Sequence, residues 1–215
     1  LRKNNPDYSL LTNSIRYRSK YEYSQGNPLL KTQKTHRFSA STSWNWLYFS
    51  AYFSRILNMY TNIIMPYKED THPGVLLFAT QTIPTTHNYG ISLNASPKLG
   101  YWEPQLNVNM AFLDMNANKI GITERRNQPR FYISLDNNFN LPKGWFFNIE
   151  GYLSTASRQG FFVTRTEGQI SARLSKSFLN ETLNIALTAN DILHTGYYHF
   201  NLYGINAYME NRIYR

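Results

Sequence analysis

Hydrophobic and polar residues alternate with a period of two over much of the chain. Between residues 131 and 141, five of the six odd positions are hydrophobic, and none of the five even positions is aliphatic. The same alternation recurs in residues 89–95, 105–112, 145–150, 169–174 and 183–188. Because successive side chains of a strand point to opposite faces, the pattern predicts extended strands with one apolar face and little helix.

The breaks between the expected strands alternate in length. Tight turns are expected near Asn45 and at residues 100–104, 142–144 and 179–181. The other breaks are expected at residues 66–74, 116–129 and 157–162, with a last and shorter one at residues 193–196. In an up-and-down meander this order puts the tight turns at one end, as in transmembrane β-barrels with short periplasmic turns and longer extracellular loops. A soluble sandwich has no reason to sort its loops by length.

The two faces of these strands are expected to meet different solvents. The polar face would line a watery lumen through Asn107, Asn109, Asp136, Asn138, Asn140, Asn148, Glu150 and Arg173. Aromatic residues gather toward the strand ends, where they would form girdles at the two membrane interfaces. These residues are Trp44, Trp46, Tyr101, Trp102, Trp145, Phe161, Phe162, Tyr197 and Tyr198.

Two segments depart from a simple crossing. Residues 74–98 are too long for one passage, so we expect a strand above the bilayer at residues 75–81, a kink at Pro84 and a crossing at residues 88–97. Arg55 lies on the apolar track, where a lipid-facing charge costs about 2 to 4 kcal/mol at the midplane. Either a bulge turns Arg55 toward the lumen, or Arg55 lies near the outer interface.

Composition narrows the class of protein. The 215 residues are 42% hydrophobic and 16% charged and contain no cysteine, which excludes disulfides and thiolate metal sites. No apolar stretch is long enough for a membrane-spanning helix. The first 37 residues carry +6 of the net +9 charge and several tyrosines. A nucleic-acid surface could have this composition, but a solvated strand pair explains it more simply, so no nucleic-acid partner is expected.

Several segments resemble the outer membrane protein beta-barrel family of the TonB-dependent receptor type. Residues 2–11 resemble its Arg-rich Pro-x-Tyr-x-x-Leu segment, and residues 25–31 its Gly-Asn-Pro-x-Leu motif. Residues 89–93, 174–179 and 190–193 resemble, in the family's order, a strand start, a late Lys-x-Phe turn and an Asn-Asp-hydrophobic ending.

The resemblance implies a larger parent barrel of about 22 strands around a plug. The chain is therefore expected to be all-β, an antiparallel up-and-down transmembrane β-barrel present as a partial barrel of roughly nine or ten strands. Residues 1–215 would be the C-terminal portion of the barrel domain, without the plug, the N-terminal regions and the last strand or strands. The implied partners are outer-membrane lipid and, through the plug, a TonB-type energy-coupling protein.

The expected function is the wall of an outer-membrane receptor or transporter that takes up a small nutrient such as a siderophore, glycan or peptide. Ligand contacts would fall to the long loops and the upper lumen, at Tyr67, Lys68, His72, Arg125, Arg126, Arg158, Tyr197, Tyr198 and His199. No metal, cofactor or catalytic residue is expected. A soluble β-rich ligand- or glycan-binding module is the alternative, and a hydrolytic barrel using Asp191 and His194 is a weaker third reading.

Overall fold

The computed structural model describes residues 1–122, 127–179 and 182–214, and most of them lie in β-strands. Helical structure among them is limited to α1 (Tyr8–Leu11) and the 3-10 turns η1 (Ala117–Ile120) and η2 (Pro142–Gly144). The strands are β1 (Arg2–Asn4), β2 (Ile15–Ser19), β3 (Glu22–Gln25), β4 (Gln33–Trp44), β5 (Leu47–Pro66), β6 (Leu76–Ala95), β7 (Trp102–Met115), β8 (Arg130–Leu141), β9 (Trp145–Ser154), β10 (Ser157–Gln159), β11 (Phe162–Thr164), β12 (Glu167–Phe178), β13 (Leu183–Ala189), β14 (Tyr197–Tyr203) and β15 (Tyr208–Tyr214). None of the helical segments described is long and apolar enough to span a membrane.

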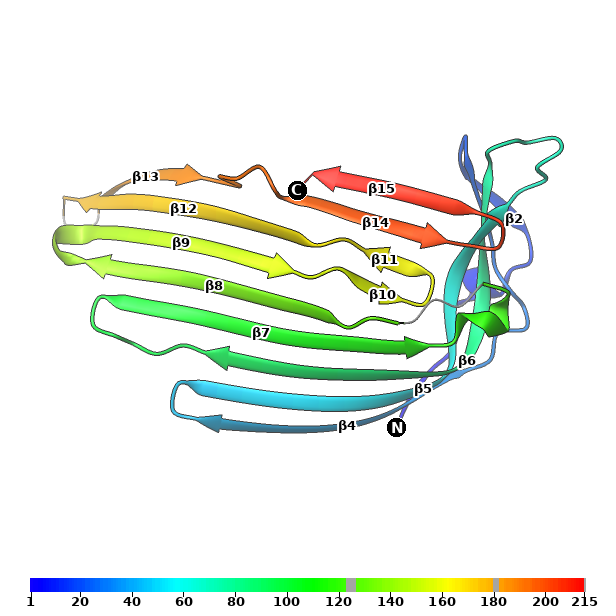
Figure 1. Ribbon diagram of the computed structural model, residues 1–215, viewed down its shortest axis with the longest axis horizontal. Helices are drawn as coiled ribbons and strands as arrows, with labels where there is room; N and C mark the ends of the chain where they lie inside the picture. Colours follow the sequence, from blue (N-terminus) through cyan, green and yellow to red (C-terminus); the bar gives the residue numbers. More distant parts are fainter. Residues whose placement is uncertain (123–126, 180–181, 215) are drawn as a thin grey trace.

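The strands form an antiparallel meander in chain order, as the alternation predicted. The main sheet runs β1-β4-β5-β6-β7-β8-β9-β12-β13, and a four-stranded sheet runs β10-β11-β14-β15. Figure 1 shows these strands side by side in one curved layer. Among the described residues the sheet does not close on itself, because β4 pairs only with β5 and the short β1, and β13 pairs only with β12. The fold is a partial β-barrel.

One predicted break was wrong, and another is shorter than expected. The chain does reverse within residues 157–162, but only Gly160 and Phe161 form the turn, because β10 and β11 pair with each other. Residues 193–196 do not reverse the chain. They interrupt a single crossing, whose lower part, β13, pairs with β12 and whose upper part, β14, pairs with β11. This explains why the expected last loop was unusually short.

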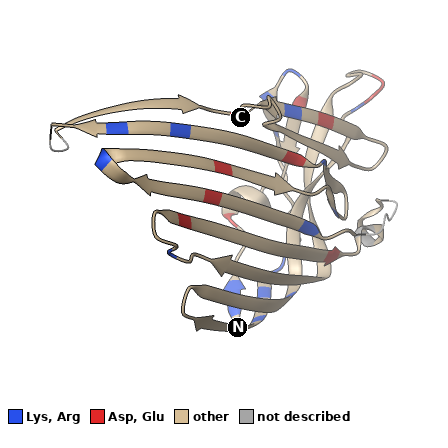
Figure 2. Ribbon diagram, turned by 60° about the vertical axis from the view of Figure 1, so that its left-hand side comes forward, with Lys and Arg blue, Asp and Glu red and all other residues tan. Residues whose placement is uncertain are grey.

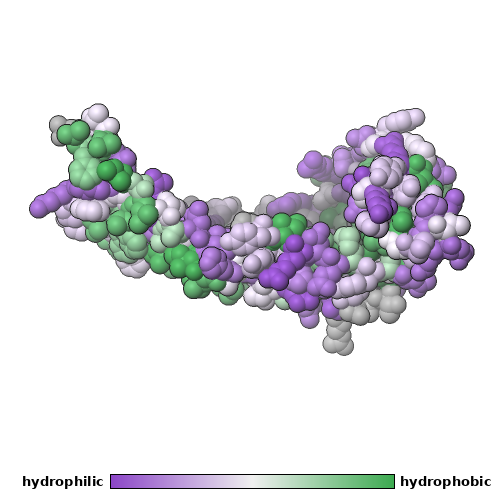
Figure 3. Space-filling view, turned by 90° about the horizontal axis from the view of Figure 1, so that it is seen from above, coloured by the Kyte–Doolittle hydropathy of each residue, from purple (hydrophilic) through white to green (hydrophobic). Residues whose placement is uncertain are grey.

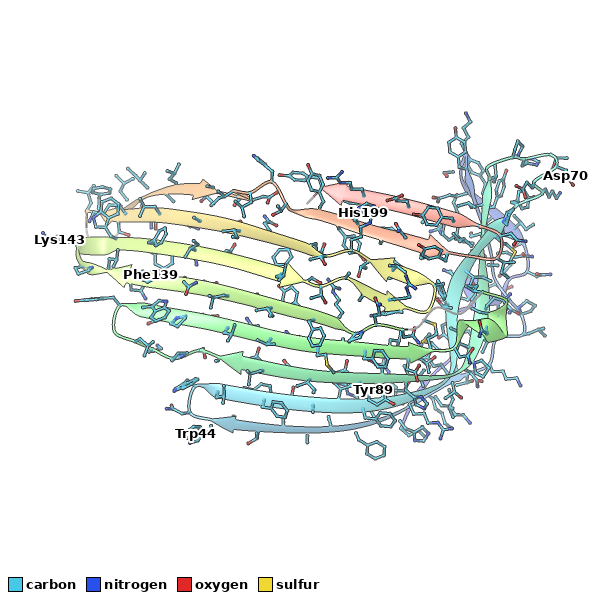
Figure 4. The ribbon with its side chains drawn as sticks, viewed as in Figure 1. Trp44, Asp70, Tyr89, Phe139, Lys143 and His199 are labelled. Atoms are coloured by element: carbon cyan, nitrogen blue, oxygen red, sulfur yellow. The ribbon has the colours of Figure 1, made fainter. Side chains whose placement is uncertain are left out.

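The tight turns do lie at one end of the sheet. Asn45 and Trp46 join β4 to β5, and η2 joins β8 to β9. Asn45 (φ 53°) and Lys143 (φ 60°) adopt the left-handed conformation that such short connections need, and asparagine tolerates it well. Figure 4 shows Trp44, Phe139 and Lys143 at this end, which we call the short-turn end, and Asp70 in a loop at the opposite, loop end.

The apolar face of the sheet is exposed in the described structure. Phe131, Ile133 and Leu135 are 41%, 43% and 41% exposed, and no second layer covers them among the described residues. A soluble binding module would bury this row, so the exposure argues against that alternative. Figure 3 shows green, hydrophobic residues along the thin left-hand part of a bowed slab and more purple, hydrophilic ones at its thicker right-hand end.

The opposite face is polar, as predicted. The register places Gln105, Asp136, Glu150 and Ser171 in one cross-strand row, with Asn138, Asn148 and Arg173 in the next row toward the short-turn end. All eight residues predicted to line a lumen share this face. Charged residues are nevertheless sparse along the strands, as Figure 2 shows, so uncharged amides and hydroxyls supply most of the polarity.

Strands β5 and β6 continue beyond the other strands and bend upright at the loop end (Figure 1). Their ladder has no paired residues at Asn58 and Pro84, between the Leu57–Thr85 and Met59–Ile83 pairs. Asn58 has a φ of 54°, and proline has no N–H to donate. The bend thus falls at Pro84, as expected, although β6 itself is continuous and ends at Ala95 rather than at residue 97.

Beyond the bend, β5 and β6 help to form a small hydrophobic core at the loop end. Ile63, Ala79, Ile83, Met115, Ile122 and Phe161 are buried together there. Phe161 therefore belongs to this core and not to a membrane girdle, because the β10/β11 tip folds against the upright hairpin. The core joins four separate segments of the chain, and so it fixes the loop end as one structural unit.

The basic N-terminal segment packs along the upper part of β5 and β6. In the β2/β3 hairpin, β2 is mostly exposed, whereas β3 is partly buried and adds to β6 as a parallel neighbour. Asn4 Nδ2 donates a 2.7 Å hydrogen bond to the Tyr60 hydroxyl, and Asn58 Nδ2 donates to the Thr32 carbonyl. The segment contains a strand pair, in agreement with the solvated-strand interpretation of its charge.

Candidate ligand-binding surfaces

Rows of aromatic side chains bound the apolar face at both ends. At the loop end, Phe38, Phe53, Tyr89 and Phe112 are neighbours across β4 to β7, and the Phe53 and Tyr89 ring centroids lie 5.2 Å apart. At the short-turn end, Trp102 and Phe147 flank Phe139, with centroid distances to it of 6.2 and 5.8 Å. Such rows are typical of the two interfaces of a membrane.

Arg55 does not turn to the polar face. It stays on the apolar track and lies in a cross-strand row with His36, His87 and Asp114, one step above the loop-end aromatic row. His87 Nδ1 lies 3.8 Å from the Asp114 carboxylate. Arg55 therefore occupies the outer interface, the second of the two positions that the sequence allowed.

On the polar face, Asp136 organises a hydrogen-bonded cluster. Its Oδ1 accepts hydrogen bonds from Asn138 Nδ2 at 2.9 Å and from Asn148 Nδ2 at 2.6 Å. Beside it lies a shallow pocket of about 310 Å³, lined by Glu150, Tyr152 and Gln169 among others. Because the amides both donate and accept hydrogen bonds and the carboxylates accept them, this surface suits a polar ligand or ordered water.

A buried ion pair marks the upper part of the polar face. Arg130 Nη2 lies 3.0 Å from Glu167 Oε1, and Arg130 Nε donates to the Ser154 hydroxyl at 2.7 Å. The Glu167 side chain is only 4% exposed, whereas that of Arg130 is 35% exposed. A buried carboxylate with one strong partner links β8, β9 and β12 at this level.

A larger pocket lies beside the break between β13 and β14. It has a volume of about 790 Å³, and its lining includes Arg165, Tyr197, His199 and Arg212. The Arg212 guanidinium carbon lies 4.0 Å from the centre of the Tyr197 ring, a cation–π contact. Cations and aromatic rings around one hollow are suited to an anionic or sugar-like ligand.

Glu210 holds the polar side of this neighbourhood together. Its Oε1 contacts His199 Nε2 and, at 3.2 Å, Arg165 Nη2, while its Oε2 accepts a hydrogen bond from the Tyr208 hydroxyl. The hydrogen bond with His199 is the main reason that the pKa of Glu210 is held below its usual value of 4.5. Glu210 therefore carries its negative charge at neutral pH and fixes the orientation of His199.

Asp191 supports the break beside this pocket. Its two carboxylate oxygens accept hydrogen bonds from the backbone N–H groups of Thr195 (2.9 Å) and Gly196 (3.1 Å). The carboxylate thus stabilises the turn, and the neighbouring His194 is exposed.

Three predicted residues come together in the loop between β5 and β6. Tyr67 stacks on Tyr23 with ring centroids 4.5 Å apart, and His72 lies 5.6 Å from Tyr67 on a tilted plane. Lys68 Nζ lies 5.6 Å from the Tyr67 ring centre. The β2/β3 hairpin thus supplies half of an aromatic cluster that only the tertiary fold assembles.

The remaining predicted site residues do not form one site. Tyr197 and His199 line the 790 Å³ pocket, whereas Tyr198 lies on the other side of β14, its ring 5.4 Å from that of Phe200. Arg158 is partly buried in β10, and its Nε has no hydrogen-bond partner among the described residues. Arg125 and Arg126 lie outside the described residues.

Sequence reasoning missed the side chains that complete these clusters: Tyr23, Arg165, Glu210 and Arg212. The last two face Tyr197 and His199 through the β14/β15 register, which pairs His199 with Arg212. The only signal in the sequence was the alternation in the last strand. Across residues 1–122, 127–179 and 182–214, no group of three or more His, Cys, Asp or Glu side chains could hold a metal ion.

Comparison with known families agrees with this architecture. The model of the outer membrane protein beta-barrel family matches residues 2–215, almost the whole chain. The chain belongs to that family, and its place is the outer membrane, where the exposed apolar face meets lipid. No curated protein and no solved structure matched the chain.

Proposed function

We propose that the chain forms part of the wall of an outer-membrane receptor or transporter of the TonB-dependent type, which takes up a small nutrient such as a siderophore, glycan or peptide. The observation that carries the proposal is the 790 Å³ pocket with Arg165, Tyr197, His199 and Arg212 around it. A passive wall needs no such concentration of cations and aromatic rings around one pocket.

The packing of the loop end supports the same proposal. The core around Ile63 and Phe161 holds the upright hairpin of β5 and β6 against the β10/β11 tip. Groups that recognise a ligand are more effective when rigid neighbours hold them in place. The Tyr23–Tyr67 stack presents a partly exposed aromatic surface at this end, and flat aromatic faces are suited to sugar rings.

Energy for uptake would come from a TonB-type partner that contacts a plug. This part of the proposal rests on the resemblance to TonB-dependent receptors. In such a receptor the described wall would bind the ligand and enclose the plug. We propose further that the wall carries out no catalysis itself, in line with the use of both Asp191 oxygens by backbone donors.

The test is uptake by cells that produce the protein, compared with cells that lack its gene. Radiolabelled iron-siderophore, oligosaccharide and oligopeptide pools serve as probes, each measured with and without a functional TonB protein. The proposal expects one pool to enter in a gene-dependent and TonB-dependent manner. Arg212→Gln should lower that uptake, whereas Arg173→Gln, which removes a polar-face charge remote from the pocket, should change it little.

Equal entry of all probes with and without the gene would refute the receptor proposal. Entry that depends on the gene but not on TonB would instead indicate a passive pore. The described polar face, with its amides and sparse charges, is compatible with that second function, and the TonB arm separates the two.

A further inference from the structure

The apolar face contains a groove at its loop end, on the part formed by β4 to β7. Its volume is about 860 Å³, and its floor includes the small side chains Ala40 and Ala51. Larger side chains rise around this floor, among them Phe38, Phe53 and Tyr89. The groove is larger than the second hollow on this face, which lies around Leu135 and Ile149 and has a volume of about 360 Å³.

Basic side chains lie directly above the groove, on the same face. Arg55 and His36 are cross-strand partners, two residues beyond Phe53 and Phe38, which places them about 7 Å above the aromatic row. Lys34 is the next residue of β4 on this face, and β1 brings Lys3 directly opposite it. All four are exposed.

The pairing of Lys3 with Lys34 is unfavourable in the isolated chain. Like charges directly opposite one another on neighbouring strands destabilise a sheet. The one carboxylate in the adjoining row, Asp114, lies at its far end beside His87. An anion held between Lys3, Lys34 and Arg55 would remove this repulsion, and phosphate is an anion that arginine binds with two hydrogen bonds and lysine as a point charge.

We propose that this groove and the basic residues above it bind a phosphorylated lipid of the outer leaflet. Lys34 and Arg55 contact the phosphate, and an acyl chain lies over Ala40 and Ala51 between the aromatic side chains. The order of the two parts matches the lipid, because the cations lie on the loop side of the aromatic row, at the level of the headgroups. The inference depends on membership of the outer-membrane family and not on the receptor function.

The experiment uses the protein purified from outer membranes in a non-ionic detergent, with bound lipid measured by native mass spectrometry. The probes are diphosphorylated lipid A, the same lipid after removal of its phosphates, and inorganic phosphate alone. The double variant Lys34→Gln/Arg55→Gln should bind diphosphorylated lipid A about 10- to 100-fold more weakly, since two charged hydrogen-bond donors are lost. Arg37→Gln removes the same charge from the same strand but from the polar face, and should change binding less than about twofold.

A second variant tests the groove with every cation in place. Ala51→Leu fills the floor with an apolar side chain that the membrane tolerates, and it should weaken binding of lipid A about tenfold. Equal binding of the dephosphorylated lipid would overturn the proposal, as would unchanged binding by the double variant. If inorganic phosphate competed as strongly as lipid A, the ligand would be a free phosphate anion, and the proposal of a lipid site would be overturned. Far-UV circular dichroism verifies that each variant folds. The comparison of lipid A with its dephosphorylated form uses the unaltered protein and does not depend on the folding of any variant.

Discussion

The assignment of lipid to one face and water to the other predicts a large difference between two neighbouring substitutions. Leu135 lies on the apolar face of β8 and is 41% exposed, whereas Ser134 lies on the polar face. Leu135→Arg should strongly destabilise the protein in a bilayer. Ser134→Arg adds the same side chain one residue away, where the lumen provides water and nearby carboxylates.

The magnitude follows from the position of Leu135 between the two ends of its face. It lies four residues from Phe131 and four from Phe139, which is about 13 Å along the strand in each direction and about 10 Å in depth for a strand tilted by about 40°. Leu135 is thus close to the midplane, where arginine costs about 2 to 4 kcal/mol. Ser134→Arg loses only the 3.3 Å hydrogen bond from Asn107, worth about 1 kcal/mol.

The assay is equilibrium unfolding in guanidinium chloride of protein reconstituted into phosphatidylcholine vesicles. Leu135→Arg should be less stable than Ser134→Arg by about 1 to 3 kcal/mol, a factor of roughly 5 to 150 in the folding equilibrium. The natural Lys176 provides a check on depth, because it lies on the apolar face at the short-turn end with its Nζ 5.4 Å from the Trp145 ring centre. If both substitutions cost the same, or if Ser134→Arg cost more, the assignment of the faces would be wrong.

Three further results are expected at the loop end. A Cβ on Gly204 would lie 1.9 Å from the Ile64 carbonyl oxygen, so Gly204→Ala should speed hydrogen exchange where β14 meets β5, at a cost of about 1 to 3 kcal/mol. The lowered pKa of Glu210 means that its carboxylate stabilises the β14/β15 hairpin above about pH 4.5 and loses this effect as the pH falls further. Glu210→Gln should remove this pH dependence from the hydrogen-exchange rates of the hairpin. A dependence that persists in the variant would exclude the His199 contact as its cause. Tyr67→Ala should cost about 0.5 to 1.5 kcal/mol of local stability by removing a stacked ring, measured as faster proteolysis of the β2/β3 hairpin, whereas Tyr67→Phe should be nearly neutral.

The strands and their faces could be predicted from the sequence because the alternation is a local property. A one-residue slip would move Phe131 and its partners to the wrong solvent, so each strand encodes its own orientation. The length of the turn within residues 157–162 and the single crossing that includes residues 193–196 could not be predicted in this way. Glycine and polar residues favour a turn and an interrupted strand equally, and only pairing with a neighbour, such as Ser157 with Thr164, separates them.

The sequence could suggest where a ligand would be met but not which side chains would meet there. The sorting of turns gives the loop end, and Tyr67, Tyr197 and His199 remain predicted ligand residues. Their partners come from other strands, as when His199 of β14 lies opposite Arg212 of β15. Such pairs depend on inter-strand register, and one sequence contains no direct signal for it. The lipid groove depends likewise on a coincidence of small residues, Ala40 opposite Ala51.

The unpaired position at Asn58 and Pro84 divides the longest strand pair into two parts with separate tasks. Below it, the number of residues is tied to the thickness of the hydrocarbon layer and can change little. Above it, the tip of the hairpin beyond the core residues Ile63 and Ala79 is not tied to that thickness and can change in length without altering the register of the wall. The outer surface could therefore diverge through changes in one hairpin tip while the embedded part stayed constant.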